Sequence, residues 1–72
     1  MFKLIPGDEP HPAVAMSLAN LGNTYLKSGN PSKAVELLQN AYEIFLKTVG
    51  AEHSDTKRAK QVLDEAIAAI ET

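Results

Sequence analysis

The sequence predicts an all-α fold in which two antiparallel helices form a hairpin and a third helix packs against it or caps it. Three observations lead to this prediction. Apolar residues recur at three- and four-residue steps along most of the chain, which is the spacing of one helical face. Gly29 and Gly50 interrupt the pattern where helices can end in the left-handed conformation. The first interruption leaves only two or three residues for a turn, so the flanking helices must fold back on each other.

The first predicted helix covers about residues 12–28. Pro12 suits a first helical position because its missing N–H would be unpaired there, and His11 then lies just outside the helix. Lys27 suits the negative end of the helix dipole. The apolar face comprises Val14, Ala15, Leu18, Ala19, Leu21, Tyr25 and Leu26.

Two further helices follow, at about residues 31–49 and 54–71. Asn30 and Pro31 form an N-cap and a first turn, and Gly50 supplies the stop. The second helix is apolar over a wide face, which predicts one neighbour on each side. We expect Ser54 to cap the third helix, which carries the narrower stripe Val62, Leu63, Ala66, Ile67 and Ile70.

The composition excludes several kinds of stabilisation and of partner. The chain has 72 residues, no cysteine and two histidines, so neither disulfides nor a structural metal site can support so small a core. A net charge of -2 gives no basic surface for nucleic acid. No apolar run approaches the roughly 20 residues that cross a bilayer, and the apolar start ends too soon, at Pro6, for a signal peptide. We expect a soluble, cytoplasmic protein with no nucleic-acid and no membrane partner.

The chain also repeats itself. The segment from Gly7 to Pro12 aligns with that from Gly50 to Ser54 when one extra residue is allowed in the first, and the two histidines lie 42 residues apart. The third helix therefore begins a second copy of the hairpin. Residues 1–5 resemble the end of a preceding second helix, because Phe2 lies 43 residues before Phe45. We expect residues 1–11 to be a lead-in with a Pro-rich loop and residues 12–72 to be the module. We also expect the whole to belong to a longer array or a larger protein.

Two runs of residues resemble the tetratricopeptide repeat in their order and spacing. They are Leu18-x2-Leu21-Gly22-x2-Tyr25 and Ala34-x3-Leu38-x2-Ala41. Small residues in these runs let helix backbones approach closely, while the leucines and the tyrosine fill the space beside them. The resemblance implies a tetratricopeptide-type hairpin, a fragment of an α-α superhelix. Leu18 replaces the family's tryptophan, and Leu46 stands where the family's pattern ends in proline.

The 42-residue period and the Gly-x-Glu-His connection are similar to the repeats of kinesin light chains. A looser similarity links the His-Pro start and the Gly-x-x-His loop to the C-terminal helical region of SET and MYND domain lysine methyltransferases. The catalytic SET portion of those enzymes is missing from this sequence. An accessory region of a larger enzyme is therefore a third interpretation, beside a binding module and a structural piece.

The resemblance implies that the first helix lines a concave surface that takes up a partner peptide or helix. Asn20 and Asn23 lie three residues apart, and their amides can donate and accept hydrogen bonds at once, as a peptide backbone requires. Ala19 stands where carboxylate-clamping repeats carry lysine. The residues predicted to contact a partner are Met16, Asn20, Asn23, Leu26, Lys27 and Arg58.

Each of these features also has a purely structural interpretation. The two asparagines can be solvated residues opposite the packed face, and Lys57, Arg58 and Lys60 can form a solvated charged face rather than attract an acidic peptide. His11 and His53 make a poor metal set and are more typical of capping residues. The apolar stripe of the third helix can serve self-association, because its next partner helix is absent from the chain.

No catalytic constellation is present in the sequence. It has no cysteine nucleophile, no glycine-rich phosphate loop and no paired carboxylates with a supporting base. We therefore expect no enzyme, no cofactor and no metal. The leading hypothesis is a scaffold that binds a partner protein or peptide. The alternative is a structural end-cap or dimerisation segment of a longer repeat protein.

Overall fold

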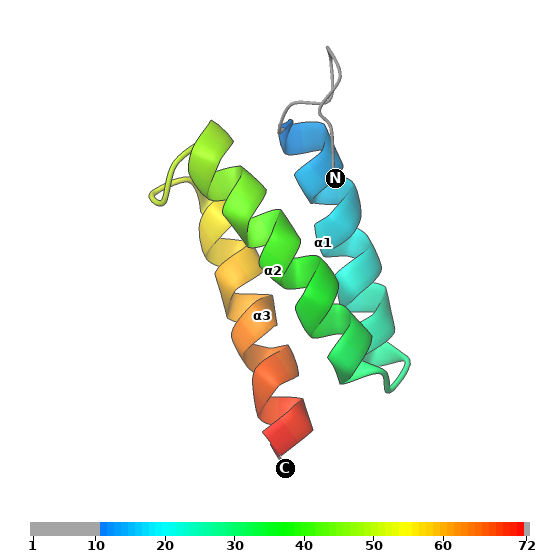
Figure 1. The fold of residues 1–72 in the computed structure, drawn as a ribbon. Coiled ribbons are helices and arrows are strands. Elements are labelled where there is room, and N and C mark those ends of the chain that lie inside the picture. Colours follow the sequence, from blue (N-terminus) through cyan, green and yellow to red (C-terminus); the bar gives the residue numbers. More distant parts are fainter. Residues whose placement is uncertain (1–10, 72) are drawn as a thin grey trace, which may run out of the picture.

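The computed structural model describes residues 11–71 and contains three α-helices in that range. They are α1 (Pro12–Lys27), α2 (Pro31–Thr48) and α3 (Ser54–Glu71). Figure 1 shows successive helices running in opposite directions. α2 packs against both other helices, while α1 and α3 touch each other far less. The all-α prediction is confirmed. Most of the predicted lead-in, residues 1–10, lies outside the described residues.

The two predicted glycine stops end α1 and α2. Gly29 and Gly50 both adopt positive φ angles, 90° and 91°, which side chains rarely tolerate. The Asn30 N–H donates to the Tyr25 carbonyl and closes the turn between the helices. Asn30 occupies the N-cap position of α2, as predicted, but its side chain makes no capping hydrogen bond. α2 ends at Thr48, one residue earlier than expected, with Val49 as its C-cap.

Histidine side chains satisfy the first backbone donors of α1 and α3. The Ala13 N–H donates to His11 Nδ1 at 3.1 Å, and the Asp55 N–H donates to His53 Nδ1 at 3.0 Å. Our prediction that Ser54 caps α3 was wrong, because Ser54 is the first helical residue and the preceding imidazole accepts the hydrogen bond. The two equivalent bonds lie 42 residues apart, so the sequence repeat is also a repeat of hydrogen bonds.

Small side chains dominate the interior. The first core cluster consists of Ala15, Ala41, Phe45 and Ala59, and the second consists of Ala34, Leu38, Leu63 and Ala66. α2 contributes to both clusters, as its wide apolar face predicted. Five of the eight residues are alanines, which allow the helix backbones to approach closely.

The closest approach of α1 and α2 occurs at Gly22. A Cβ atom added there would lie 2.7 Å from Leu38 Cγ and 3.4 Å from the Ala34 carbonyl oxygen. Leu38 is 1% exposed, so its side chain has no free space into which to move. The predicted close contact at Gly22 is therefore present.

Leu21 departs from the prediction that it fills the hairpin interior. Its side chain is 47% exposed, and that of Val14, seven residues earlier on the same side of α1, is 51% exposed. Both are exposed, so no described helix buries them. The apolar spacing was correct, but it combined residues that face α2 with residues that face away from it.

Replacing Gly22 by alanine is expected to destabilise the hairpin. Because Leu38 is buried and has no room to move, overpacking should cost about 2–3 kcal/mol, the upper part of the usual range. The better helix propensity of alanine recovers about 1 kcal/mol, so the free energy of unfolding should fall by roughly 1–2 kcal/mol. Urea unfolding of the Gly22→Ala variant measures this change.

Gln39→Ala, at an exposed position of α2, is the matched control and should change stability by less than about 0.5 kcal/mol. If Gly22→Ala is as stable as the parent chain, Leu38 is not held against α1 as described.

Candidate functional site

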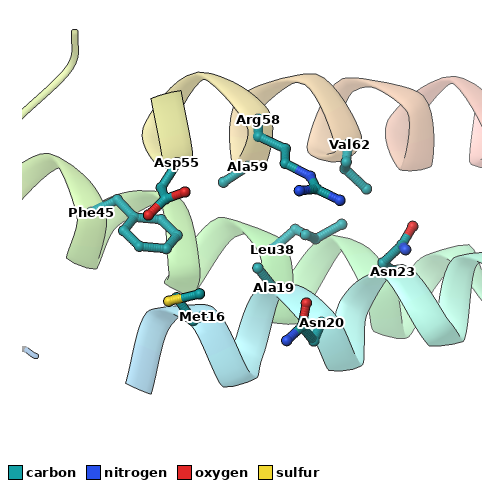
Figure 2. Close-up of a pocket in the computed structure, with 10 residues that line it drawn as sticks. All are labelled: Met16, Ala19, Asn20, Asn23, Leu38, Phe45, Asp55, Arg58, Ala59 and Val62. Atoms are coloured by element: carbon teal, nitrogen blue, oxygen red, sulfur yellow. The ribbon is translucent and has the colours of Figure 1, made fainter. Parts of the chain in front are cut away.

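Side chains from all three helices line a groove of about 110 Å³, here called the α1–α3 groove. Figure 2 shows its two rims on α1 and α3 and its floor on α2. The α1 rim comprises Met16, Ala19, Asn20 and Asn23. The α3 rim comprises Asp55, Arg58, Ala59 and Val62, and the floor comprises Leu38 and Phe45.

The floor of the groove is rigid and apolar. Leu38 and Phe45 are 1% and 2% exposed, and each belongs to one of the two core clusters. The packing of α2 against α1 and α3 holds both side chains in place. The groove therefore offers an apolar base whose shape the core fixes.

The α1 rim presents two amide groups. Asn20 is exposed and Asn23 is half-buried, and both line the groove. Within residues 11–71, neither side-chain amide makes a hydrogen bond, so both can bind a partner. The structure brings Met16 to the same rim, with its side chain 51% exposed.

The α3 rim carries one cation and one carboxylate. The Arg58 side chain is exposed and forms no ion pair within residues 11–71, and Figure 2 shows its guanidinium extending into the space above Leu38. Asp55 is half-buried, and its Oδ2 lies 3.7 Å from His53 Nδ1. The groove thus has separated positive and negative positions on one side and neutral amides on the other.

Two of the predicted contact residues do not line the groove. Leu26 is half-buried and packs against the second core cluster, because it lies four residues after Gly22 on the face of α1 that contacts α2. Lys27 is exposed in the last turn of α1, beyond the residues that form the rim.

The predicted cationic cluster is divided between two sides of α3. Lys57 and Lys60 line a separate hollow with Tyr42, while Arg58 faces the groove. Lys57 Nζ lies 3.5 Å from Glu52 Oε1, and Lys60 Nζ lies 3.6 Å from Asp64 Oδ2. One of the three cations therefore reaches the α1–α3 groove.

The sequence analysis did not identify Asp55 or Val62 as groove residues. A signal for Val62 was present, because the 42-residue period makes Arg58 equivalent to Met16 and Val62 equivalent to Asn20. Both residues of each of these two pairs line the groove. Asp55 was interpreted only as a favourable charge at a helix start, and its position beside Phe45 depends on the angle between α2 and α3.

A buried hydroxyl connects the start of α3 to the end of α2. Thr56 is 1% exposed, and its Oγ1 donates to the Gly50 carbonyl at 2.6 Å. This bond ties the first turn of α3, which carries Asp55 and Arg58, to the residue that ends α2. It fixes the α3 rim relative to the floor.

Other kinds of site were sought among residues 11–71. No group of three histidine, cysteine or carboxylate side chains in that range is arranged to hold a metal ion. None of the three helices combines the length and the apolar character needed to span a membrane.

The family model of the tetratricopeptide repeat matches residues 14–55, which is more than half of the chain. The chain belongs to the tetratricopeptide repeat family. This repeat includes all of α2 and most of α1, and it ends in the first turn of α3. The chain has no significant match among the curated proteins or the solved structures compared with it. Tetratricopeptide repeats are typically non-catalytic scaffold modules. Membership of this family supports a general role in protein–protein interaction for this chain.

Removing the Thr56 hydroxyl is expected to loosen α3. In Thr56→Val the shape is kept but the hydrogen bond to Gly50 is lost, so the free energy of unfolding should fall by about 1 kcal/mol. Chemical denaturation followed by circular dichroism measures the change.

Thr48→Val removes a similar bond, from Oγ1 to the Ile44 carbonyl at 2.7 Å, at an exposed position. This control should lose less than about 0.5 kcal/mol. Equal losses in the two variants would show that burial of the Thr56 bond does not stabilise the α2–α3 connection.

Proposed function

We propose that this tetratricopeptide repeat binds an extended segment of a partner protein in the α1–α3 groove. The observation that carries the proposal is the combination of a fixed apolar floor with polar groups on both rims that have no partner within residues 11–71. Asn20 and Asn23 provide these groups on α1, and Arg58 provides one on α3.

The side chains of Asn20 and Asn23 form hydrogen bonds with the partner's backbone. Each amide offers an acceptor oxygen and two N–H donors, which matches the alternating donors and acceptors of an extended peptide. Because the two residues lie three apart on one helix, they hold successive backbone groups along the rim. This part of the interaction does not depend on the partner's side chains.

Specificity comes from the other rim and from the floor. An apolar side chain of the partner packs on Leu38 and Phe45 between Met16 and Val62. The Arg58 guanidinium attracts a carboxylate, while Asp55 repels one. The groove therefore favours a peptide with an apolar residue followed by an acidic residue. The peptide binds in the chain direction that places its carboxylate beside Arg58.

The affinity of a single groove is limited by its size. A volume of about 110 Å³ accommodates one or two side chains. Lys27 and Leu26 lie beyond the groove lining, so they contribute only if the partner continues past the end of α1. Additional repeats that extend the groove would strengthen binding through more such contacts.

A second candidate function, the structural end-cap, is favoured by the exposed face of α3. The face of α1 that packs against α2 or the core clusters carries Ala15, Ala19, Gly22 and Leu26. The 42-residue period assigns an equivalent residue of α3 to each of these four positions. Those equivalents are Lys57, Gln61, Asp64 and Ala68. Charges at two of these positions oppose the packing of a following helix, because burial would desolvate Lys57 and Asp64, which are exposed and form ion pairs with Glu52 and Lys60. The capping role and the groove can coexist in one module.

The repeat subtype, self-association and location of the protein are also part of the proposal. The 42-residue period supports the kinesin-light-chain-like subtype more than the looser similarity to SET and MYND domain enzymes. Self-association through α3 has Ile67 and Ile70 as its exposed apolar residues. An accessory role in a larger enzyme and a cytoplasmic location likewise stay predictions.

Substitutions on the two rims are expected to weaken peptide binding. With a peptide selected from a random display library on the parent chain, Asn23→Ala and Arg58→Gln should each raise Kd by about 2- to 10-fold, through loss of a hydrogen bond or an ion pair. Isothermal titration calorimetry measures the affinity, and amide chemical shifts locate the peptide.

Lys60→Gln makes the same change of charge as Arg58→Gln on the side of α3 that faces away from the groove, and it should leave Kd unchanged. Peptides that bind all variants equally, or that shift only the exposed face of α2, would contradict the proposal.

A further inference from the structure

A histidine contacts the one carboxylate that lines the α1–α3 groove. His53 immediately precedes α3, and Asp55 lines the groove with Met16 and Phe45, at the end away from Asn23 (Figure 2). Nδ1 of His53 accepts the backbone N–H of Asp55 at 3.0 Å, and it also lies 3.7 Å from Oδ2 of the same residue. The two side chains are 43% and 40% exposed, so protons from solvent reach the imidazole.

The two contacts require opposite protonation states of the imidazole. Nδ1 accepts the Asp55 N–H only when the ring is neutral and carries its proton on Nε2. A protonated ring has an N–H at both nitrogens, so it loses this hydrogen bond and can donate to the nearby Oδ2 instead. Protonation of His53 therefore exchanges the partner of Nδ1 from the backbone of Asp55 to its side chain.

This exchange changes the charge that the groove presents to a partner. With a neutral His53, the Asp55 carboxylate opposes the Arg58 guanidinium on the same rim. A protonated His53 offsets the carboxylate, so Arg58 then dominates the field at the α3 rim. The residues of α1 and α2 that line the groove carry no charge: they are Met16, Ala19, Asn20, Asn23, Leu38 and Phe45.

The other charged neighbours of His53 lie along the same segment of chain. Lys57 Nζ lies 3.5 Å from Glu52 Oε1, so these two charges largely offset each other. Tyr42, the residue of α2 that lies nearest to this pair, lines the hollow with Lys57 and does not line the groove. Asp55 is therefore the group in the groove whose charge His53 controls.

The α3 rim keeps its position when the imidazole changes partner. Thr56 Oγ1 donates to the Gly50 carbonyl, and the Lys57 N–H donates to the His53 carbonyl at 3.1 Å. Neither hydrogen bond involves the imidazole. Protonation thus changes the charge of the rim while these bonds hold the first turn of α3 against α2.

We propose that His53 makes the α1–α3 groove sensitive to pH, so that the groove binds an acidic partner segment more tightly when the imidazole is protonated and pairs with Asp55. This inference rests on the proposed function of the groove. The repeat contains a natural comparison, because His11 accepts the Ala13 N–H in the same way. Residue 13 has no carboxylate, so protonation of His11 removes a cap without changing the charge of the groove.

Calorimetric titrations at pH 7.5 and pH 5.5 test the proposal, because histidine side chains change charge in this range. The probe is a library-selected peptide that has an apolar residue followed by glutamate and contains no histidine. Its Kd for the parent chain should be about 2- to 5-fold lower at pH 5.5, as expected for one partly exposed charge pair. The same peptide with glutamine in place of glutamate should bind equally at both pH values.

Three variants identify the groups responsible. His53→Asn keeps an acceptor for the Asp55 N–H but cannot be protonated, so its Kd should be the same at both pH values. Asp55→Asn should also lose the pH dependence, and at pH 7.5 it should bind the acidic peptide more tightly than the parent does. His11→Asn is the matched control and should keep the pH dependence of the parent.

The exchange of partners can also be observed without any peptide. In the parent chain, the Asp55 amide proton resonance should move as its hydrogen bond is lost, with the same midpoint as the His53 ring resonances. An Asp55 amide that does not follow His53 would overturn the proposal.

The binding results separate this inference from the proposed function. A peptide that binds in the groove with equal Kd at both pH values, or a pH dependence that persists in His53→Asn, would overturn the inference and leave the groove as a binding site. Peptides that bind outside the groove at both pH values would overturn the proposed function, and this inference with it.

Discussion

The contact between Gly22 and Leu38 is the constraint on which the rest of the structure depends. Because Gly22 has no side chain, α2 approaches α1 closely enough for Leu38 to lie beneath it. One side of Leu38 thus sets the spacing of the hairpin, and the other forms the floor of the α1–α3 groove. The depth of the groove is therefore a consequence of hairpin packing. A wider spacing of the helices would lower stability and deform the site together.

Three sides of α1 have different environments. Ala15 and Gly22 face the interior, Asn20 and Asn23 face the groove, and Leu21 is exposed on a third side. A helix with three such faces has little room for charges, which explains why Lys27, in the last turn, is its only one. The same division explains why apolar periodicity placed Leu21 in the hairpin interior although its side chain is exposed. It also explains why Leu26, which the family resemblance placed on the concave surface, packs against the second core cluster instead.

Features that depend on local chemistry were predictable from the sequence, whereas features that depend on the angle between helices were not. Gly29 and Gly50 located two helix ends, because a positive φ strongly favours glycine. The cap of α3 was misassigned because serine is the commoner capping residue, although the imidazole of His53 accepts equally well. Asn20 and Asn23 were placed on the groove by family resemblance. Asp55 could not be placed there, since its position requires α3 to cross α2 near Phe45.

The two ends of the module are chemically opposite, and this limits how it can be extended. The exposed positions of α1 that correspond to the buried positions of α3 are all uncharged. The positions of α3 that would have to receive a following helix include Lys57 and Asp64, which are exposed and paired with Glu52 and Lys60. Covering α3 would desolvate those charges, whereas covering α1 removes apolar surface from water. If α3 has the proposed end-cap role, growth by stacking is favoured on the α1 side. The groove lies between the two ends and stays open in that arrangement.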